Sequence, residues 1–207
     1  TAGLNLYYMD YHDQLVLNGK QSDVGGKLSE NVASSHRMGA ELNASWKICP
    51  MLRWDLAGAV SQNQIKQYNL YAWSDLAGDE VLTTYDRTPI AYSPQLVLSN
   101  TLTFAHRAFE AALTSQYVGM QYLDNTGSRE RSLPAYHVAS LRLGYELPVH
   151  FVRSWSISLQ INNLFDARYS SNGGAGYTFD KKGAISSYTW TYPQAGIHAF
   201  LGTTITI

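Results

Sequence analysis

The sequence predicts an all-β protein built from antiparallel strands, and three observations lead to this prediction. Polar and apolar residues alternate with a period of two from end to end, and no stretch has the period of an amphipathic helix. The connections between the alternating segments are short and long in strict turn. Charged residues make up only 15% of the 207 residues, against 13% aromatic residues. A soluble globular domain has about 25% charged residues.

About eight strands are expected from the alternation. The first segment, around 4–17, and the last, around 197–207, are strand-like but less regular. Between them, every second residue is apolar over much of six segments: 38–46, 52–60, 96–104, 109–113, 141–147 and 155–161. Polar residues such as Arg53, Arg142 and Gln160 occupy the intervening positions. Each strand therefore has one apolar and one polar face.

The connections predict an up-and-down order of strands. The short connections are 47–51, 105–108 and 148–153, and the long ones are about 18–31, 62–91, 121–135 and 163–191. Strict alternation places all the short turns at one end of the sheet. A β-sandwich mixes its loop lengths more freely. Transmembrane β-barrels combine tight turns at one end with long loops at the other.

Aromatic residues flank each short turn and share the apolar phase of their strands. They are Trp46, Trp54, Phe104, Phe109, Tyr145 and Trp155. Amphipathic rings are stable where hydrocarbon meets lipid headgroups, so this pattern predicts an aromatic girdle at the membrane interface. Alternatively, these rings could close one end of a soluble core. The polar opposite phase favours the girdle, because those side chains need water while the apolar face contacts lipid.

Composition and motifs exclude several classes of function. The net charge is −1 and no basic run occurs, so nucleic-acid binding is not expected. The single cysteine, Cys49, excludes an internal disulfide and a cysteine-cluster metal site. No nucleophile elbow is present, and the six histidines lack metal-ligand spacing. We therefore expect neither an enzyme nor a resident metal or cofactor.

The long connections contain the candidate ligand-binding residues. Aromatic rings beside polar groups suit flat ligands by stacking, although they equally suit packing between loops or an outer girdle. Arg129 and Arg131 could bind an anionic ligand with two guanidiniums, or could pack against neighbouring loops or bind lipopolysaccharide phosphates. The segment 172–177, NGGAGY, is interpreted as a flexible loop tip. The aromatic candidates are Tyr68, Tyr71, Trp73, Tyr177 and Trp190.

Four blocks resemble the C-terminal barrel region of TonB-dependent outer-membrane receptors, especially those of the Bacteroidetes type. The most specific is INNLFDARYSSNGG (161–174), followed by a closing strand, and YVGMQYLDNTGSRERSLPAY (117–136) is nearly as specific. NLYYMDYHDQLV (5–16) and YPQAGIHAFLGTTITI (192–207) complete the set. The blocks occur in the expected order and cover essentially the whole chain. In NNLFD, Asn162, Asn163 and Asp166 are suited to bind backbone groups where a strand leaves the barrel wall.

The resemblance implies a fold and a function. Such receptors have a barrel of about 22 strands, plugged by an N-terminal domain. They import scarce ligands such as iron–siderophore complexes, haem or cobalamin, and glycans in one branch. Their energy comes from TonB, which grips a box near the N-terminus. Residues 1–207 would then form the C-terminal part of an outer-membrane barrel, without the plug or the TonB box, in contact with lipid and lipopolysaccharide.

Two other interpretations fit parts of the pattern. A self-contained eight-stranded outer-membrane barrel with a structural or adhesion role would pair its first strand with its last. A soluble carbohydrate-binding β-sandwich would use the loop aromatics as a sugar platform. The two alternatives differ from the receptor interpretation in how the strands close and in which face is buried.

Overall fold

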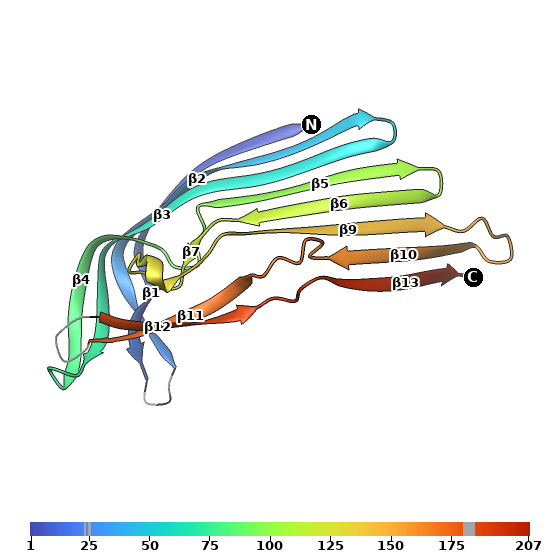
Figure 1. The fold of residues 1–207 in the computed structure, drawn as a ribbon. Helices are drawn as coiled ribbons and strands as arrows, with labels where there is room; N and C mark the ends of the chain where they lie inside the picture. The colour runs from blue at the N-terminus through green and yellow to red at the C-terminus, as the bar shows by residue number, and fades with distance from the viewer. Residues whose placement is uncertain (23, 25, 180–184) are drawn as a thin grey trace.

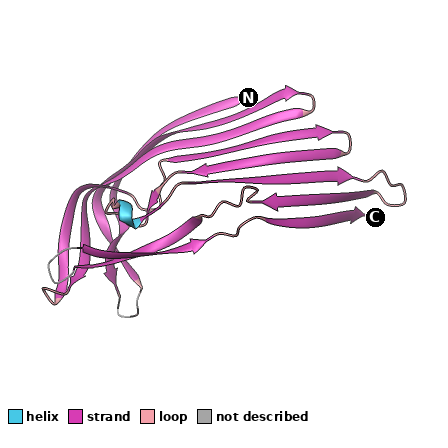
Figure 2. Cartoon of the chain, viewed as in Figure 1, coloured by secondary structure: helices cyan, strands magenta, loops and turns pink. Residues whose placement is uncertain are grey.

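Figure 1 shows the computed structural model of the chain, in which one large curved sheet bends over at one end. Of residues 1–207, the structure describes 1–22, 24, 26–179 and 185–207, and it describes only the backbone of residues 21, 27, 177, 179 and 185. Strands dominate the described residues, as Figure 2 shows, beside one short 3-10 helix, η1 (Arg129–Arg131). No helix in these ranges is long and apolar enough to cross a membrane.

Eight antiparallel strands lie side by side along the main path of the sheet. Their order is β1 (Ala2–Gln21), β2 (Lys27–Cys49), β3 (Leu52–Ser74), β5 (Leu96–His106), β6 (Phe109–Val118), β9 (Tyr136–Glu146), β10 (Ser154–Asn162) and β13 (His198–Thr206). Every neighbouring pair on this path is antiparallel. The prediction of about eight up-and-down strands in an all-β fold is therefore confirmed.

The remaining strands extend the sheet at one end. β4 (Asp79–Pro89) pairs with β3, and β11 (Ser170–Phe179) forms a hairpin with β12 (Ile185–Pro193). β7 (Gln121–Tyr122) and β8 (Ser132–Leu133) form a separate two-stranded sheet beside η1. The expected long loops are thus largely strands, because β2 begins and β3 ends far beyond the predicted limits of their strands, while β1 ends only slightly later than predicted.

The segment 172–177 corrects one expectation. It belongs to β11 and is paired with β12, so it is not a flexible loop tip. Gly174 lies opposite Trp190, and Gly176 lies opposite Tyr188. A Cβ atom on either glycine would come within 2.3 Å of the opposite ring. The glycines therefore make room for two aromatic side chains on the neighbouring strand.

All three short turns lie at the end of the sheet that also carries both chain termini (Figure 1). We call this the short-turn end. At the β5–β6 turn, Arg107 adopts a left-handed conformation (φ 53°), which lets the chain reverse within two residues. The opposite end carries β4, β7, β8, η1, β11 and β12, and we call it the long-loop end. The predicted asymmetry of the connections is confirmed.

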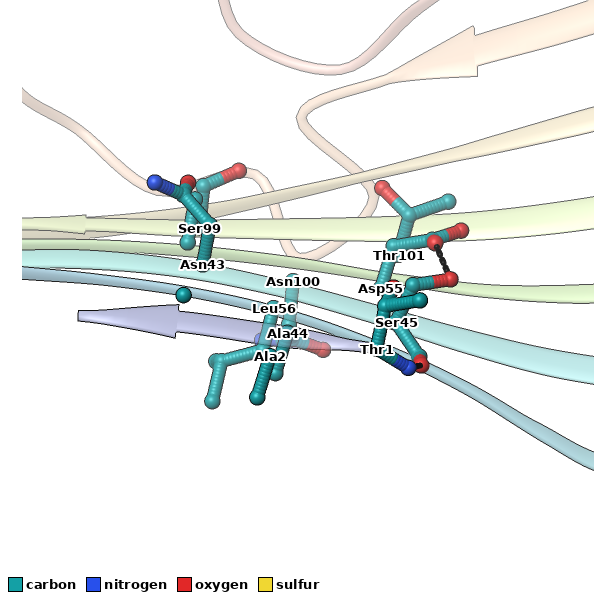
Figure 3. A pocket seen from close by; sticks show the side chains of 12 residues that line it. Thr1, Ala2, Asn43, Ala44, Ser45, Asp55, Leu56, Ser99, Asn100 and Thr101 are labelled. Atoms are coloured by element: carbon teal, nitrogen blue, oxygen red, sulfur yellow. Dashed lines mark hydrogen bonds between the residues drawn. The ribbon is translucent and has the colours of Figure 1, made fainter.

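The strand register aligns apolar side chains in rows across one face. One row is Trp46, Trp54, Leu102, Leu113, Leu141 and Ile161. The next is Leu52, Phe104, Ala111, Leu143, Leu159 and Leu201. On the other face, the matching row is Arg53, Thr103, Ala112, Arg142, Gln160 and Phe200. We call these the apolar face and the polar face. In Figure 3, Ser99 and Thr101 project on the opposite side of the sheet from Ala44 and Leu56.

No second sheet packs on the apolar face in the described ranges. Trp46, Trp54 and Ile157 are 60%, 37% and 38% exposed, so they do not form the interior of a soluble sandwich. β1 and β13 lie at opposite edges of the main path and do not pair with each other. A self-contained eight-stranded barrel requires that pairing. Both alternative interpretations therefore disagree with the fold.

The compact core of the chain lies towards the long-loop end, around a change of phase in the strands. Asp13 in β1 and Gln67 in β3 have positive φ values of 54° and 55°. In β3, the side chain of Ile65 is buried before Gln67, and those of Tyr68 and Leu70 are buried after it. The buried side chains therefore change from odd-numbered to even-numbered positions at Gln67. The core residues are Val16, Val32, Ile65, Tyr68, Leu70 and Ile90.

The assignment of the two faces makes a direct prediction. Arginine in place of Leu159, which lies between Leu143 and Leu201 on the apolar face, should cost about 2–4 kcal/mol of barrel stability if that face contacts lipid. Arginine in place of the neighbouring Gln160 on the polar face should cost far less. Unfolding of the two variants in lipid vesicles measures the difference, and equal costs would contradict the assignment.

Candidate functional site

A cavity of about 290 Å³ lies at the long-loop end. It is bounded by β1, β2, β3, β4, the segment 123–125 and the β11–β12 hairpin. These segments are distant in sequence and meet because β1–β3 extend beyond the wall and the hairpin crosses towards β3. The backbone of Phe179 reaches Ser74 at the end of β3. We call this space the long-loop cavity.

A lysine and a tyrosine form a charged corner of the cavity. The Nζ atom of Lys20 lies 3.2 Å from Oε2 of Glu80 and 4.0 Å from the centre of the Tyr71 ring. The carboxylate balances the charge of Lys20, and the ring face attracts the ammonium as a cation–π contact. Tyr71 is one of the predicted ligand residues, and its ring is therefore partly occupied by an internal contact.

Tyr68, another predicted ligand residue, forms part of the cavity wall but is only 1% exposed. Its hydroxyl donates a hydrogen bond to the carbonyl of Leu17, at 3.0 Å. Its ring centre lies 6.2 Å from that of Tyr85. These contacts join β1, β3 and β4, so Tyr68 supports the cavity from within the core.

The other predicted aromatic residues divide between two depressions. Trp73 lines the long-loop cavity and is 49% exposed, and Tyr188 lines it from β12. Trp190 instead lines a neighbouring, more open depression together with Tyr92. Its ring centre lies 5.9 Å from that of Tyr188. The side chain of Tyr177 lies outside the described residues.

The two predicted arginines lie in different environments, because Arg131 is buried and Arg129 is exposed. Arg131 is 4% exposed, and its Nε lies 2.5 Å from Oδ2 of Asp124. Its guanidinium also donates to the Thr126 hydroxyl at 2.6 Å, while Arg129 is exposed on the surface. Arg131 is thus directed into its own loop and does not face an anion at the mouth beside Arg129. This geometry corresponds to the packing interpretation of the pair.

Sequence reasoning missed three residues that hold the cavity together. The Asn125 side chain accepts a hydrogen bond from the backbone N–H of Ala91 at 2.8 Å and donates one to the carbonyl of Leu17 at 3.3 Å. The Tyr92 hydroxyl donates to the carbonyl of Gly173 at 3.1 Å. Burial raises the pKa of Tyr92, and the Asp124 carboxylate raises it further, so the hydroxyl keeps its proton. The side-chain amide of Gln121 donates a hydrogen bond to the carbonyl of Ser171, at 3.4 Å.

Two of the three polar residues predicted to bind backbone groups in the NNLFD block, Asn163 and Asp166, bind the two connectors that carry the β11–β12 hairpin. The Asn162 side chain instead contacts the side chains of Gln160 and His198. The Asn163 side chain is buried and donates to the carbonyls of Ala167 and Ala195, at 2.9 and 3.1 Å. Oδ1 of Asp166 accepts the N–H of Ile197, at 2.9 Å. The first connector follows β10 and the second precedes β13, so these bonds fix where the hairpin leaves the wall.

The six predicted girdle residues lie together at the short-turn end. Trp46 lies directly opposite Trp54, and Phe109 lies opposite Tyr145. The ring centres of Phe104 and Phe109 are 6.3 Å apart. The indole N–H of the sixth member, Trp155, donates to the Thr203 hydroxyl at 2.8 Å. The role of this band at a lipid interface remains a prediction.

No described group of three or more His, Cys, Asp or Glu side chains is arranged to hold a metal ion. Cys49 lies at the β2–β3 turn with a free thiol. The polar side chains that do converge at the long-loop end bind one another or backbone groups. This chemistry suits recognition of a bound molecule, with aromatic faces and fixed polar groups around a small space.

Comparison with known families decides the membership of the chain. Residues 1–164 match the family model described as TonB dependent receptor-like, beta-barrel. The chain belongs to this receptor family. Members are proteins of the bacterial outer membrane, so that is where the chain is located. The Bacteroidetes type remains a prediction.

The curated relatives include two pesticin receptors. The receptor of Yersinia enterocolitica serotype O:8 / biotype 1B is 24% identical over 169 residues, covering 81% of this chain and 22% of that protein. The receptor of Yersinia pestis is 25% identical over 145 residues, covering 69% of the chain and 19% of that protein. The chain thus spans about a fifth of the length of the curated relatives it matches.

Solved structures show the same fold. The siderophore receptor PiuA from Acinetobacter baumannii has a TM-score of 0.68 at 16% identity, over 98% of this chain and 25% of its own. The ferric yersiniabactin uptake receptor FyuA from Yersinia pestis has a TM-score of 0.62 at 19% identity, and the match covers 98% of this chain and 26% of FyuA. The copper transporter OprC has a TM-score of 0.63 at 21% identity, and the match covers 98% of this chain and 28% of OprC.

The buried Arg131–Asp124 ion pair can be tested in the full-length receptor. Replacing Arg131 with methionine leaves the Asp124 carboxylate without its cation, which should cost about 3–5 kcal/mol and open the segment 121–135. Limited proteolysis of intact cells should then cleave this segment faster than in the wild type. Arg129→Met removes the same charge from the surface and should leave the cleavage rate unchanged, whereas equal cleavage of both variants would contradict the structural role.

Proposed function

We propose that residues 1–207 form the C-terminal part of the barrel wall of an outer-membrane receptor that imports a scarce, large ligand. The ligand classes are iron–siderophore complexes, haem and cobalamin, and the protein is a transporter rather than an enzyme. The observation that carries this proposal is the long-loop cavity at the end of a two-faced wall. Membership of the receptor family and the siderophore and copper cargoes named for similar structures support it.

The cavity recognises one flat part of a larger ligand. Its volume of about 290 Å³ is at the lower limit of small-molecule pockets, which enclose about 300–1,000 Å³. The exposed rings of Trp73 and Tyr188 offer stacking surfaces. Because Glu80 balances Lys20, the charged corner is nearly neutral and selects by shape and stacking more than by net charge. The remainder of the ligand would contact other loops of the complete receptor.

Transport requires more than this chain. The free edges of β1 and β13 need further strands to close the barrel, since unpaired backbone groups are costly in hydrocarbon. The polar face would then line a hydrated bore, occupied by the plug domain that the family resemblance implies. TonB would act on a region outside residues 1–207 and move the plug. The wall itself holds the loops in place and excludes lipid from the path.

Uptake by the full-length receptor tests this proposal. Trp73→Ala and Tyr188→Ala should each weaken ligand binding about 10-fold or more, because buried aromatic contacts dominate recognition. Radiolabelled iron–siderophore, haem and cobalamin are offered to cells that express each variant, and binding is measured on ice before uptake at growth temperature.

Two controls separate binding from energised import. Leu76→Ala removes an exposed apolar side chain at the β3–β4 turn that does not line the cavity, and this variant should bind as the wild type does. Cells without TonB should bind ligand but accumulate none. Wild-type accumulation in those cells, or wild-type binding by both cavity variants, would overturn the proposal.

A further inference from the structure

We propose that a row of side chains on the apolar face of the sheet, at its long-loop border, binds the phosphate groups of lipopolysaccharide. The row consists of His12, Ser34, Lys66 and Arg87 from β1, β2, β3 and β4. We call it the basic row. The inference rests on the outer-membrane location and on the orientation of the faces, and it is independent of which ligand is imported.

The register places all four residues directly opposite one another. His12 pairs with Ser34, Ser34 with Lys66, and Lys66 with Arg87. From Trp54 to Lys66 the pairing of β3 with β2 is continuous, and no residue in between has a positive φ. Even-numbered side chains of β3 therefore stay on one face. Lys66 consequently projects on the same face as Trp54 and Leu56, towards the lipid and away from the bore.

Two like charges stand side by side without a counter-ion. Lys66 and Arg87 are both exposed, and no described carboxylate oxygen lies within 4.0 Å of either cation. Directly opposed like charges on neighbouring strands destabilise a sheet. Nε2 of His12 lies 3.7 Å from Oδ2 of Asp10, so the imidazole already has an acidic neighbour. An anion held between Lys66 and Arg87 would remove the repulsion between them.

The height of the row corresponds to lipid headgroups. Lys66 is twelve positions beyond Trp54, the girdle residue near the short-turn end of β3. At about 3.3 Å per residue this distance is about 40 Å along the strand, or about 30 Å along the barrel axis for a tilt near 40°. The hydrocarbon-facing band of an outer-membrane barrel is about 25 Å tall. The basic row therefore lies just beyond the hydrocarbon, on the side of the long loops.

Phosphate is the chemistry that this arrangement fits. The guanidinium of Arg87 can donate two parallel hydrogen bonds to phosphate oxygens, and the ammonium of Lys66 adds a point charge beside it. The Ser34 hydroxyl lies between these cations and His12 in the row. On the long-loop side of a bacterial outer membrane, the lipid at headgroup depth is lipopolysaccharide. Its phosphates would approach from the apolar face, where no other part of the described chain covers the row.

The test measures lipopolysaccharide bound to the full-length receptor in nanodiscs. Wild type and the double variant K66A/R87A are titrated with phosphorylated and with phosphatase-treated lipopolysaccharide, and bound lipid is counted by native mass spectrometry. Each basic side chain at an anionic surface contributes about fivefold, so the double variant should bind phosphorylated lipopolysaccharide about 25- to 30-fold more weakly. K66R/R87K keeps both charges and should retain most of the affinity.

Matched controls make each outcome decisive. R37A/R142A removes two cations from the polar face and should bind lipopolysaccharide as the wild type does. Phosphatase treatment should weaken binding to the wild type but not to K66A/R87A. Equal affinity of wild type and K66A/R87A, or equal losses in both double-alanine variants, would overturn the site. Micromolar binding of inorganic phosphate to the wild type in nanodiscs without lipopolysaccharide, lost in K66A/R87A, would instead assign the row to free phosphate and overturn its assignment to a lipid headgroup.

Discussion

The need to satisfy backbone hydrogen bonds within the sheet underlies the whole structure. A strand that crosses hydrocarbon has no partner except another strand, so each wall strand pairs along its length with its neighbours. That pairing fixes the register, and the register turns alternating sequences into continuous apolar and polar rows. The rows through Trp54 and through Arg53 show the result, because adjacent residues of one strand lie in different environments. Turns, loops and aromatic band are arranged around this constraint.

At the long-loop end, buried side chains and side-chain hydrogen bonds stabilise the structure. Around Gln67 the chain forms a small core that includes Ile65, Tyr68 and Leu70. Polar side chains such as Asn125 connect distant segments at this end of the sheet. The β11–β12 hairpin is fixed at its base by Asn163 and Asp166. Recognition is thus placed on loops that a rigid scaffold positions, which is where binding residues commonly occur.

The sequence predicted the wall well because its signal is local. Period-two alternation, short turns and flanking aromatics each depend on a few consecutive residues. The long-loop end was predicted poorly, since its burial depends on contacts between distant segments. From the sequence, Arg131 is expected to be a surface charge, but in the structure it is buried in an ion pair with Asp124. Gly174 is expected to be flexible, but in the structure it lies in a strand opposite Trp190. The expected strand ended near Val60, although β3 continues to Ser74, and the phase change at Gln67 left no recognised signal.

The most direct test of the two-faced wall is spin-label accessibility along β10 in the full-length receptor, reconstituted in a bilayer with Cys49→Ser as background. Single labels at positions 157 to 161 are measured with oxygen, which partitions into lipid, and with a water-soluble nickel complex. The account predicts high oxygen accessibility at 157, 159 and 161 and high nickel accessibility at 158 and 160. The reverse order, or no alternation, would contradict it.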